Sequence, residues 1–299
     1  MLLIAAKVHR FMSINEVQDV QVDSTVTVLV GMNEAGKTVF LRALEKSNDA
    51  VELAKFDVIS DYPRKDLSGY QRKHKDAPAL VTELTYKLDN KEVDQLNAGL
   101  HTKLEHGFTF SCNRDYNGKE SITIEIEEDS AAAQITTSFP WSTDARAAIA
   151  NTKSIREISL LLKAANLTDA DKAQLSTIEA RVAKTNWDKV IEAEVWAWIK
   201  PRIPKFLYFS DYDLLPSKVN LADLATRTEQ AKTDPKQLTA AHRATLALLR
   251  MADISIQEIT KTGGYESLKA KIEGVSISLT DQIMAVSYTH LTLPTIYSV

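Results

Sequence analysis

The stretch "GMNEAGKT", Gly31 to Thr38, sets the main expectation for this chain because its spacing is G-x-x-x-x-G-K-T. Glycines at both ends let the main chain curl, so that its N–H groups and the start of a following helix point at one anion. Average residue frequencies give such a match by chance in roughly one chain in a hundred of this length. The simpler alternative is a glycine turn followed by an incidental lysine, and the flanking sequence decides between the two.

The segments on either side of the loop have the patterns of a strand and a helix. "TVTVLV", Thr25 to Val30, is dense in β-branched residues and predicts a strand. "TVFLRALEKS" follows the loop and places Phe40, Leu41 and Leu44 on one helical face. Strand, loop and helix in this order are the context that a phosphate-binding loop requires.

The motif assigns a role to each residue of the loop. Lys37 is expected to place its ammonium on the β- and γ-phosphates and to be the catalytic residue, while the Thr38 hydroxyl would bind Mg²⁺. Asn33 has two possible roles, contact with the γ-phosphate side or shaping of the turn. The expected cofactors are ATP and Mg²⁺. The predicted nucleotide contacts are Gly31, Asn33, Glu34, Ala35, Gly36, Lys37, Thr38 and Val39.

The sequence around the loop resembles a family. The stretch "KVHRFMSINEVQDVQVDSTVTVLVGMNEAGKTVFLRALEKS", Lys7 to Ser47, is similar to the N-terminus of the RecF, SMC and OLD-like ATPases, whose heads are of the ABC type. These AAA-family P-loop ATPases act in DNA repair or phage defence. The shared pattern is a strand with an "FRSI"-like corner, a short hairpin and "VLVGxNxxGKT". Met12 stands where the family usually has a polar residue. The matching residues are Phe11, Ser13, Ile14, Gly31, Asn33, Gly36, Lys37 and Thr38.

The resemblance implies both a fold and an activity. The fold would be α/β, a P-loop NTPase of the ABC-type head with a mixed sheet around a central helix and a helical insertion or lobe. ATP would bind between two heads of a homodimer, and its hydrolysis would drive a conformational change. One head would offer an "LSGGQ"-like signature, and a Walker B strand ending in Asp-Glu would supply the Mg²⁺ ligand and the base. DNA is a partner by family inference only.

Neither expected motif is clear in the sequence. "DLSGYQRK", Asp66 to Lys73, resembles the signature but follows the phosphate loop too soon, and a solvated loop rich in turn residues is the favoured interpretation. "FLYFSD", ending at Asp211, is the best Walker B candidate, although Ser210 intervenes and no glutamate follows. A turn aspartate at the end of a strand is the alternative for Asp211.

Further strand and helix patterns divide the chain into segments. Strands are predicted over residues 2–11, 17–23, 79–88, 107–116 and 120–128, and a surface loop over 51–76. Helical spacing begins after Trp141, with Thr168 as an expected N-cap. The predicted organisation is an N-terminal ATPase lobe at 1–150, a helical insertion at 151–200, a returning strand at 201–215 and a truncated helical segment at 216–285.

The remaining residues, 286–299, are expected to be an artefact. "VSYTHLTLPT", Val286 to Thr295, is typical of a translated sequencing-library adapter, so natural sequence is expected to end near Met284. The signature and Walker B would then lie beyond the truncation. Three functions stay open: an ATPase in the full-length protein, a nucleotide-binding interaction switch without turnover, and the ATPase half of an OLD-like endonuclease whose nuclease domain is missing.

Composition gives weaker constraints. The 299 residues carry a net charge of −4, which does not indicate a nucleic-acid protein, and basic residues of the 51–76 loop are diluted by aspartates. The one cysteine, Cys112, cannot form an internal disulfide, so a reducing, cytoplasmic location is expected. No apolar run approaches the roughly 20 residues of a membrane helix, and no membrane partner is expected.

Overall fold

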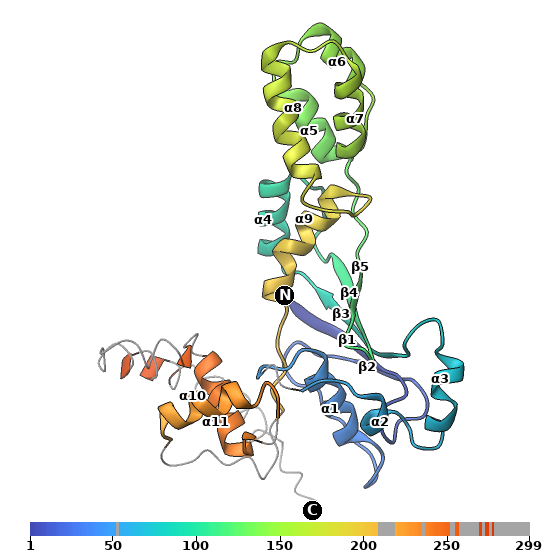
Figure 1. Ribbon diagram of the computed structural model, residues 1–299, viewed down its shortest axis with the longest axis vertical. Helices are drawn as coiled ribbons and strands as arrows, with labels where there is room; N and C mark the ends of the chain where they lie inside the picture. Colours follow the sequence, from blue (N-terminus) through green and yellow to red (C-terminus); the bar gives the residue numbers. More distant parts are fainter. Residues whose placement is uncertain are drawn as a thin grey trace, which may run out of the picture. The chain divides into compact units, whose positions relative to one another are not determined.

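The chain is a mixed α/β protein in a computed structural model (Figure 1) that describes residues 1–51, 54–208, 219–234 and 237–251, with the short pieces 255–256, 269–270, 273–274 and 277. The strands are β1 (Leu2–Val8), β2 (Gln18–Gln21), β3 (Leu80–Lys87), β4 (Thr109–Asp115) and β5 (Glu120–Thr123). The α-helices are α1 (Lys37–Ser47), α2 (Val58–Asp61), α3 (Tyr70–Lys73), α4 (Asn90–Leu100), α5 (Asp129–Ser138), α6 (Thr143–Ile149), α7 (Ile155–Ala164), α8 (Asp169–Val182), α9 (Val190–Ile199), α10 (Leu221–Gln230) and α11 (Ala240–Met251). Two 3₁₀ turns are η1 (Leu67–Gly69) and η2 (Lys200–Arg202).

The five strands form one antiparallel sheet in the order β2-β1-β3-β4-β5. A tight turn joins β4 to β5, in which Gly118 has a φ of 73° and donates its N–H to Asp115. A left-handed residue is needed there, and glycine adopts it without a steric penalty. The strands predicted at residues 2–11, 17–23, 79–88 and 107–116 are confirmed, and the strand predicted at 120–128 ends at Thr123.

The strand predicted at Thr25–Val30 is wrong: these residues belong to no strand. Val28 is 66% exposed and Val30 is 89% exposed, and within the described residues no other segment pairs with this one. Just upstream, the Asp23 carboxylate accepts hydrogen bonds from the N–H and hydroxyl of Thr25, while the Asp23 N–H donates to the Thr27 hydroxyl. Such local side-chain bonds compete with strand pairing. The expected core sheet of a P-loop fold is therefore not formed by this segment.

The chain divides into two compact units. Unit 1 comprises Met1–Ala5, Glu83–Asn113 and Glu120–Pro204, and unit 2 comprises Ala6–Thr82, Arg114–Lys119 and Lys205–Val299. In unit 1, α7 packs against α5, α6 and α8, and α4 packs against α9 (Figure 1). The helices predicted between Trp141 and Pro201 are confirmed, and of the predicted helical segment 216–285 the structure describes α10 and α11. Helix α4 was not predicted, although Asp89 and Glu92 form a capping box at its start.

A buried carboxylate joins two helices of unit 1 at their N-termini. Glu128 is 3% exposed, and its oxygens accept the N–H of Ile155 at 3.1 Å and the N–H of Ile191 at 2.9 Å. Neither α7 nor α9 has a capping hydrogen bond from its own N-cap side chain. One side chain therefore satisfies orphan donors of both helices and places a negative charge at two positive helix ends.

The start of α8 is fixed in a related way. Thr168 is its N-cap, as predicted, and exchanges hydrogen bonds with Asp171 in a capping box. Asp171 also accepts the N–H of Ser142, which precedes α6. Hydrogen bonds from Ser142 and then Thr168 lower the pKa of Asp171 to about 2. The carboxylate thus ties the starts of two helices together in its charged form.

In unit 2, a small hydrophobic cluster includes residues of α10 and α11. Val51, Leu224, Leu246 and Ala247 are buried in it. Phe206 forms an isolated parallel bridge with Asp49, its N–H donating to Asn48 and its carbonyl accepting from Ala50. Of the strand predicted within 201–215, the described residues show this single bridge, and residues 209–215 lie outside them. The Walker B candidate Asp211, and the predicted natural end near Met284 with the tail 286–299, lie outside the described residues.

We predict that Glu128→Gln lowers the free energy of unfolding by about 1–3 kcal/mol, the usual cost of leaving a buried polar group unpaired. Glutamine keeps the shape but offers one acceptor where the two helix N-termini need two, and it removes the charge. The neighbouring Glu127 has an 87% exposed side chain, so Glu127→Gln is the matched control and should change little. Urea unfolding followed by circular dichroism measures both, and equal stability of the two variants would contradict the capping role.

Candidate functional site

Two residues of the loop before α1 have a left-handed main-chain conformation. Glu34 has a φ of 66° and Gly36 a φ of 88°. The loop closes on itself, since the Ala35 N–H donates to the Met32 carbonyl at 3.2 Å and a Cβ built on Gly31 would lie 3.4 Å from the Ala35 Cβ. Left-handed residues beside a helix start are typical of loops whose N–H groups turn toward one point, and such a concavity can bind an anion.

The start of α1 adds to this concavity. Gly36 is its N-cap, no side chain caps it, and no acidic residue lies in its first turn. The first hydrogen bond of the helix runs from the Phe40 N–H to the Gly36 carbonyl at 2.8 Å. The N–H groups before Phe40 therefore have no acceptor within the helix, and the positive end of the helix dipole lies at the loop.

The Lys37 side chain folds back over the loop. Its Nζ donates to the Gly31 carbonyl at 2.8 Å and to the Met32 carbonyl at 2.7 Å. These bonds hold the ammonium at the first two residues of the loop, where it adds a full positive charge. Thr38, at the second position of α1, is exposed and offers one hydroxyl at the same edge. The predicted contact residues, from Gly31 to Val39, thus form one continuous surface feature.

A sharp corner at the end of β1 supports the loop from behind. A Cβ on Gly36 would lie 3.6 Å from Cγ1 of Ile14 and 3.8 Å from the Ser13 hydroxyl. The corner is closed by hydrogen bonds in both directions between Phe11 and Ile14, and Met12 has a φ of 48°. Ser13 and Ile14, two residues of the "FRSI"-like corner, therefore lie close to Gly36 of the loop.

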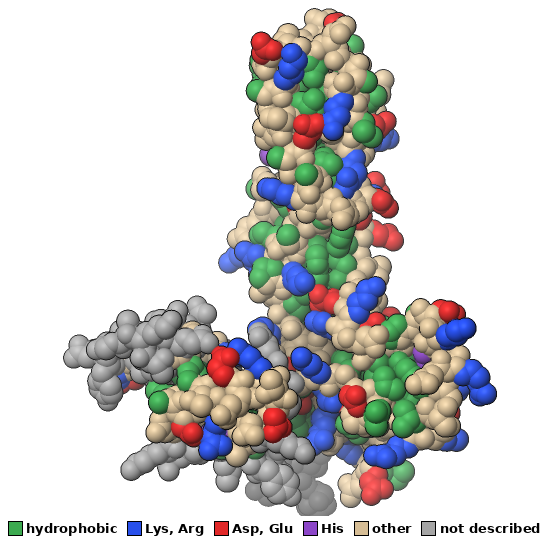
Figure 2. Space-filling model, viewed as in Figure 1, with side chains coloured by type: hydrophobic (Ala, Val, Ile, Leu, Met, Phe, Trp, Pro, Cys, Tyr) green, Lys and Arg blue, Asp and Glu red, His purple; other side chains and the backbone are tan. Residues whose placement is uncertain are grey.

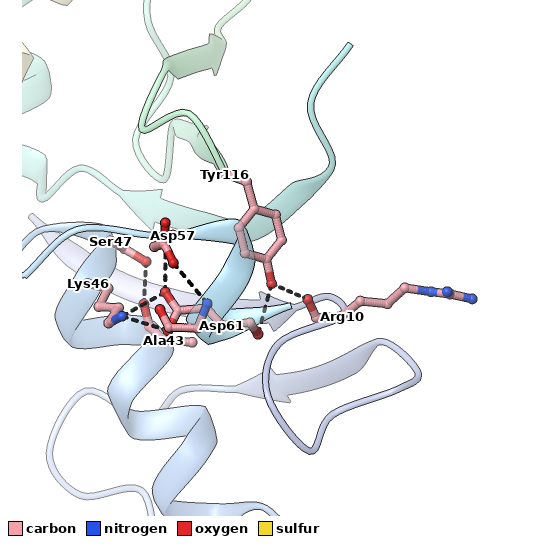
Figure 3. Close-up of polar contacts among 8 residues, drawn as sticks. Arg10, Ala43, Lys46, Ser47, Asp57, Asp61 and Tyr116 are labelled. Atoms are coloured by element: carbon pink, nitrogen blue, oxygen red, sulfur yellow. Dashed lines mark hydrogen bonds and ion pairs between the residues drawn. The ribbon is translucent and has the colours of Figure 1, made fainter. Parts of the chain in front are cut away.

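A buried acid, Asp61, organises the structure around the C-terminal end of α1 (Figure 3). Asp61 is 1% exposed, and both of its carboxylate oxygens accept from Lys46 Nζ, at 2.8 and 2.7 Å. The carboxylate also accepts the Asp57 N–H at 2.9 Å and the Ser60 hydroxyl at 3.2 Å. A buried charge is tolerated only when it is paired and hydrogen-bonded in this way.

The same residue links α1 to the corner through its main chain. The Asp61 carbonyl accepts from the Met12 N–H and, at 3.2 Å, from the Tyr116 hydroxyl. That hydroxyl lies 2.5 Å from the Arg10 carbonyl, while the Arg10 side chain extends away from the network (Figure 3). Burial, followed by the negative charge of Asp61, raises the pKa of Tyr116, which keeps its proton available for these bonds. Helix α1, the corner and the β4–β5 turn are thus connected.

The segment 51–76, predicted to be a surface loop, is in part buried and ordered. Tyr62 is 1% exposed, and its ring makes edge-on contacts with Tyr70 and Tyr116 at centroid distances of 4.8 and 5.5 Å. The signature-like stretch Asp66–Lys73 contains η1 and α3, and the Asp66 carboxylate pairs with Arg10 at 2.7 Å. The prediction failed because the buried residues of this segment have no regular spacing, and their partners are distant in sequence.

Comparisons with known proteins identify no family for this chain. No protein-family model matches the sequence, and no curated protein matches it. Within the described part of the chain, no three His, Cys, Asp or Glu side chains are grouped so that they could hold a metal ion. A search of the same residues finds no helix with the length and apolar character that crossing a membrane would need.

Lys46→Met is expected to lower the free energy of unfolding by about 3–5 kcal/mol, because it leaves the buried Asp61 carboxylate without its counter-charge. Lys55 is exposed, so Lys55→Met is the control for loss of a lysine charge. Chemical denaturation of both variants measures the difference. If Lys46→Met is as stable as the control, Asp61 does not depend on this pair.

Proposed function

We propose that this protein binds Mg·ATP through the loop Gly31–Thr38 and that the full-length protein is a P-loop ATPase of the ABC-type, RecF/SMC/OLD-like group. The observation that carries the proposal is the pair of left-handed residues, Glu34 and Gly36, directly before an uncapped helix N-terminus. This arrangement gathers main-chain donors, a helix dipole and the Lys37 ammonium at one surface point. A polyphosphate is the ligand with the charge and the acceptors to use all three.

The residues have distinct parts in this proposal. Main-chain N–H groups from Asn33 to Val39 would hold phosphate oxygens, and the Ala35 N–H would first have to leave the Met32 carbonyl. When ATP binds, the Lys37 ammonium leaves the carbonyls of Gly31 and Met32 and donates to the β- and γ-phosphates. Hydrogen bonds to two neutral carbonyl oxygens are then replaced by a stronger hydrogen bond to a charged phosphate oxygen. Thr38 supplies one hydroxyl for Mg²⁺, which keeps most of its water and binds largely through the phosphates.

The family resemblance extends the proposal to partners. Two copies of the head would enclose ATP as a homodimer, and DNA would be bound by the assembled protein in repair or phage defence. Among the described residues, no strand ends in the Asp-Glu pair of a Walker B motif, so the described residues support nucleotide binding more directly than hydrolysis. A nucleotide-binding switch without turnover is therefore the second candidate function.

Lys37→Ala should lower the affinity for ATP at least tenfold, or about 1.4 kcal/mol, because it removes the only side-chain cation of the loop. Lys55→Ala is the matched control and should bind as the wild type does. Gly36→Ala should also weaken binding, since a left-handed alanine costs about 1–2 kcal/mol and distorts the concavity. Isothermal titration calorimetry with ATP and with AMP measures these effects. Equal affinity of wild type and Lys37→Ala would exclude the loop as the site.

The two candidate functions differ in turnover. If the chain is a switch, we expect stoichiometric ATP binding with phosphate release no faster than that of Lys37→Ala. A coupled phosphate-release assay at saturating Mg·ATP makes the comparison. Steady turnover by the wild type that Lys37→Ala abolishes would contradict the switch and show that this chain contains a complete hydrolytic site.

A further inference from the structure

The Thr25–Val30 segment of unit 2 has the composition of a strand and no strand beside it. All of its residues except Leu29 are β-branched, and none of the six has a positive φ, so no residue has to leave a left-handed conformation to extend. Within the described part of the chain, the main-chain groups of Thr27 and Leu29 make no hydrogen bond. These donors and acceptors are therefore open to a strand from elsewhere.

The side chains of this segment divide between two faces. Val26, Val28 and Val30 are 36%, 66% and 89% exposed, whereas Leu29 is partly buried. Because side chains alternate along an extended chain, the three valines share one face, and this face points to solvent. The segment contains no charge, proline or glycine, which is the sequence signature of association between strands.

Exposed hydrophobic side chains in other parts of the molecule are separated by charges. Over α6, α7 and α8, Figure 2 shows single hydrophobic side chains among basic and acidic ones. Scattered residues of this kind are normal on a protein surface. The run from Ser24 to Asn33 differs because no charged residue interrupts it.

The segment is complementary to itself in one antiparallel register. When two copies align with Val28 opposite Val28, Val26 lies opposite Val30, so each valine of the exposed face meets a valine. A shift by one residue would place valines opposite Thr27 and Leu29 instead. With Val28 in a non-hydrogen-bonded pair, Thr27 of each copy exchanges both main-chain hydrogen bonds with Leu29 of the other. The open main-chain groups are thus the ones that this register uses.

Asp23 limits the length and the direction of such a ladder. Hydrogen bonds from Thr25, followed by one from the Val26 N–H, lower the pKa of Asp23, so the Thr25 N–H is already in use. The ladder therefore ends at Thr27 and leaves the loop Gly31–Thr38 free. A parallel pairing in register would place the two Asp23 carboxylates side by side, and like charges directly opposite each other destabilise a sheet.

We propose that two copies of this chain associate through antiparallel pairing of Thr25–Val30, centred on Val28. The two copies use the same surface, so the contact closes as a dimer. A ladder this short gives a weak dimer, whose population rises with protein concentration. This contact goes beyond the proposed ATP-dependent pairing of heads, because it involves no residue of the phosphate-binding loop and forms without nucleotide.

Single cysteines test the register in the absence of nucleotide. The two Cα atoms of a non-hydrogen-bonded pair lie about 4.5 Å apart, within the range of a disulfide. On mild oxidation, Val28→Cys should therefore form a disulfide-linked dimer roughly tenfold faster than Val30→Cys, whose counterpart lies four residues further along the partner strand. Val30 is the more exposed residue, so random collision would favour Val30→Cys. The native Cys112 is buried, and the wild type should not cross-link.

A second measurement follows association itself, by light scattering of the eluting protein at increasing concentration. Val28→Lys should stay monomeric where the wild type dimerises, because two lysines would face each other at the centre of the ladder. Leu160→Lys is the matched control, since Leu160 is 67% exposed on α7 and Val28 is 66% exposed, and it should dimerise as the wild type does. Circular dichroism checks that these surface variants keep the fold.

Several outcomes would overturn the proposal. They are a wild type that stays monomeric at all concentrations, association that Val28→Lys leaves unchanged, and the absence of a disulfide in Val28→Cys. Equal cross-linking of Val28→Cys and Val30→Cys would also overturn it, because a parallel pairing or random collision gives that result. In contrast, a mixture of Val26→Cys and Val30→Cys that cross-links faster than either variant alone would support the antiparallel register.

Discussion

The buried pair of Lys46 and Asp61 is the interaction on which the loop region depends. A carboxylate that is 1% exposed must have its charge and its lone pairs satisfied, and Asp61 achieves this with one lysine, one main-chain N–H and one hydroxyl. Its carbonyl then positions Tyr116 and the corner at Met12. The C-terminal end of α1 is fixed by these contacts, and the helix therefore gives a defined direction to its N-terminal end, where the proposed phosphate-binding loop lies.

In several places of the structure, a charged side chain makes the hydrogen bonds that another main-chain segment would otherwise make. Glu128 caps two helices that have no capping side chain of their own, and Glu192 with Lys189 completes the hydrogen bonding of Ile126. In each case a charged group enters a region where regular secondary structure has ended. The charge strengthens the hydrogen bond, and each such residue joins two elements that are distant in sequence.

Local patterns in the sequence predicted local structure well. The "GMNEAGKT" spacing predicted the loop before a helix, alternation predicted most strands, and Thr168 predicted the start of α8. Thr25–Val30 has the composition of a strand, but a strand also needs a neighbour, and composition does not supply one. Lys46, Asp61 and Tyr116 were not identified because they are separated by 15 and 55 residues, and no periodicity connects them. Asp89 and Glu92 did carry a signal for α4, the spacing of a capping box.

The unpaired Thr25–Val30 segment has a thermodynamic consequence. The C-terminal end of the loop, at Gly36, lies close to Ser13 and Ile14. The segment that precedes the loop has Val28 and Val30 exposed to solvent. A ligand that orders the loop also restricts the segment leading into it, and the lost conformational entropy lowers the affinity. Any partner that pairs with this segment removes part of that cost. Such a partner would raise the affinity for the ligand by a certain factor, and the ligand would raise the affinity for the partner by the same factor. The two binding equilibria would thus be linked through the six residues Thr25–Val30.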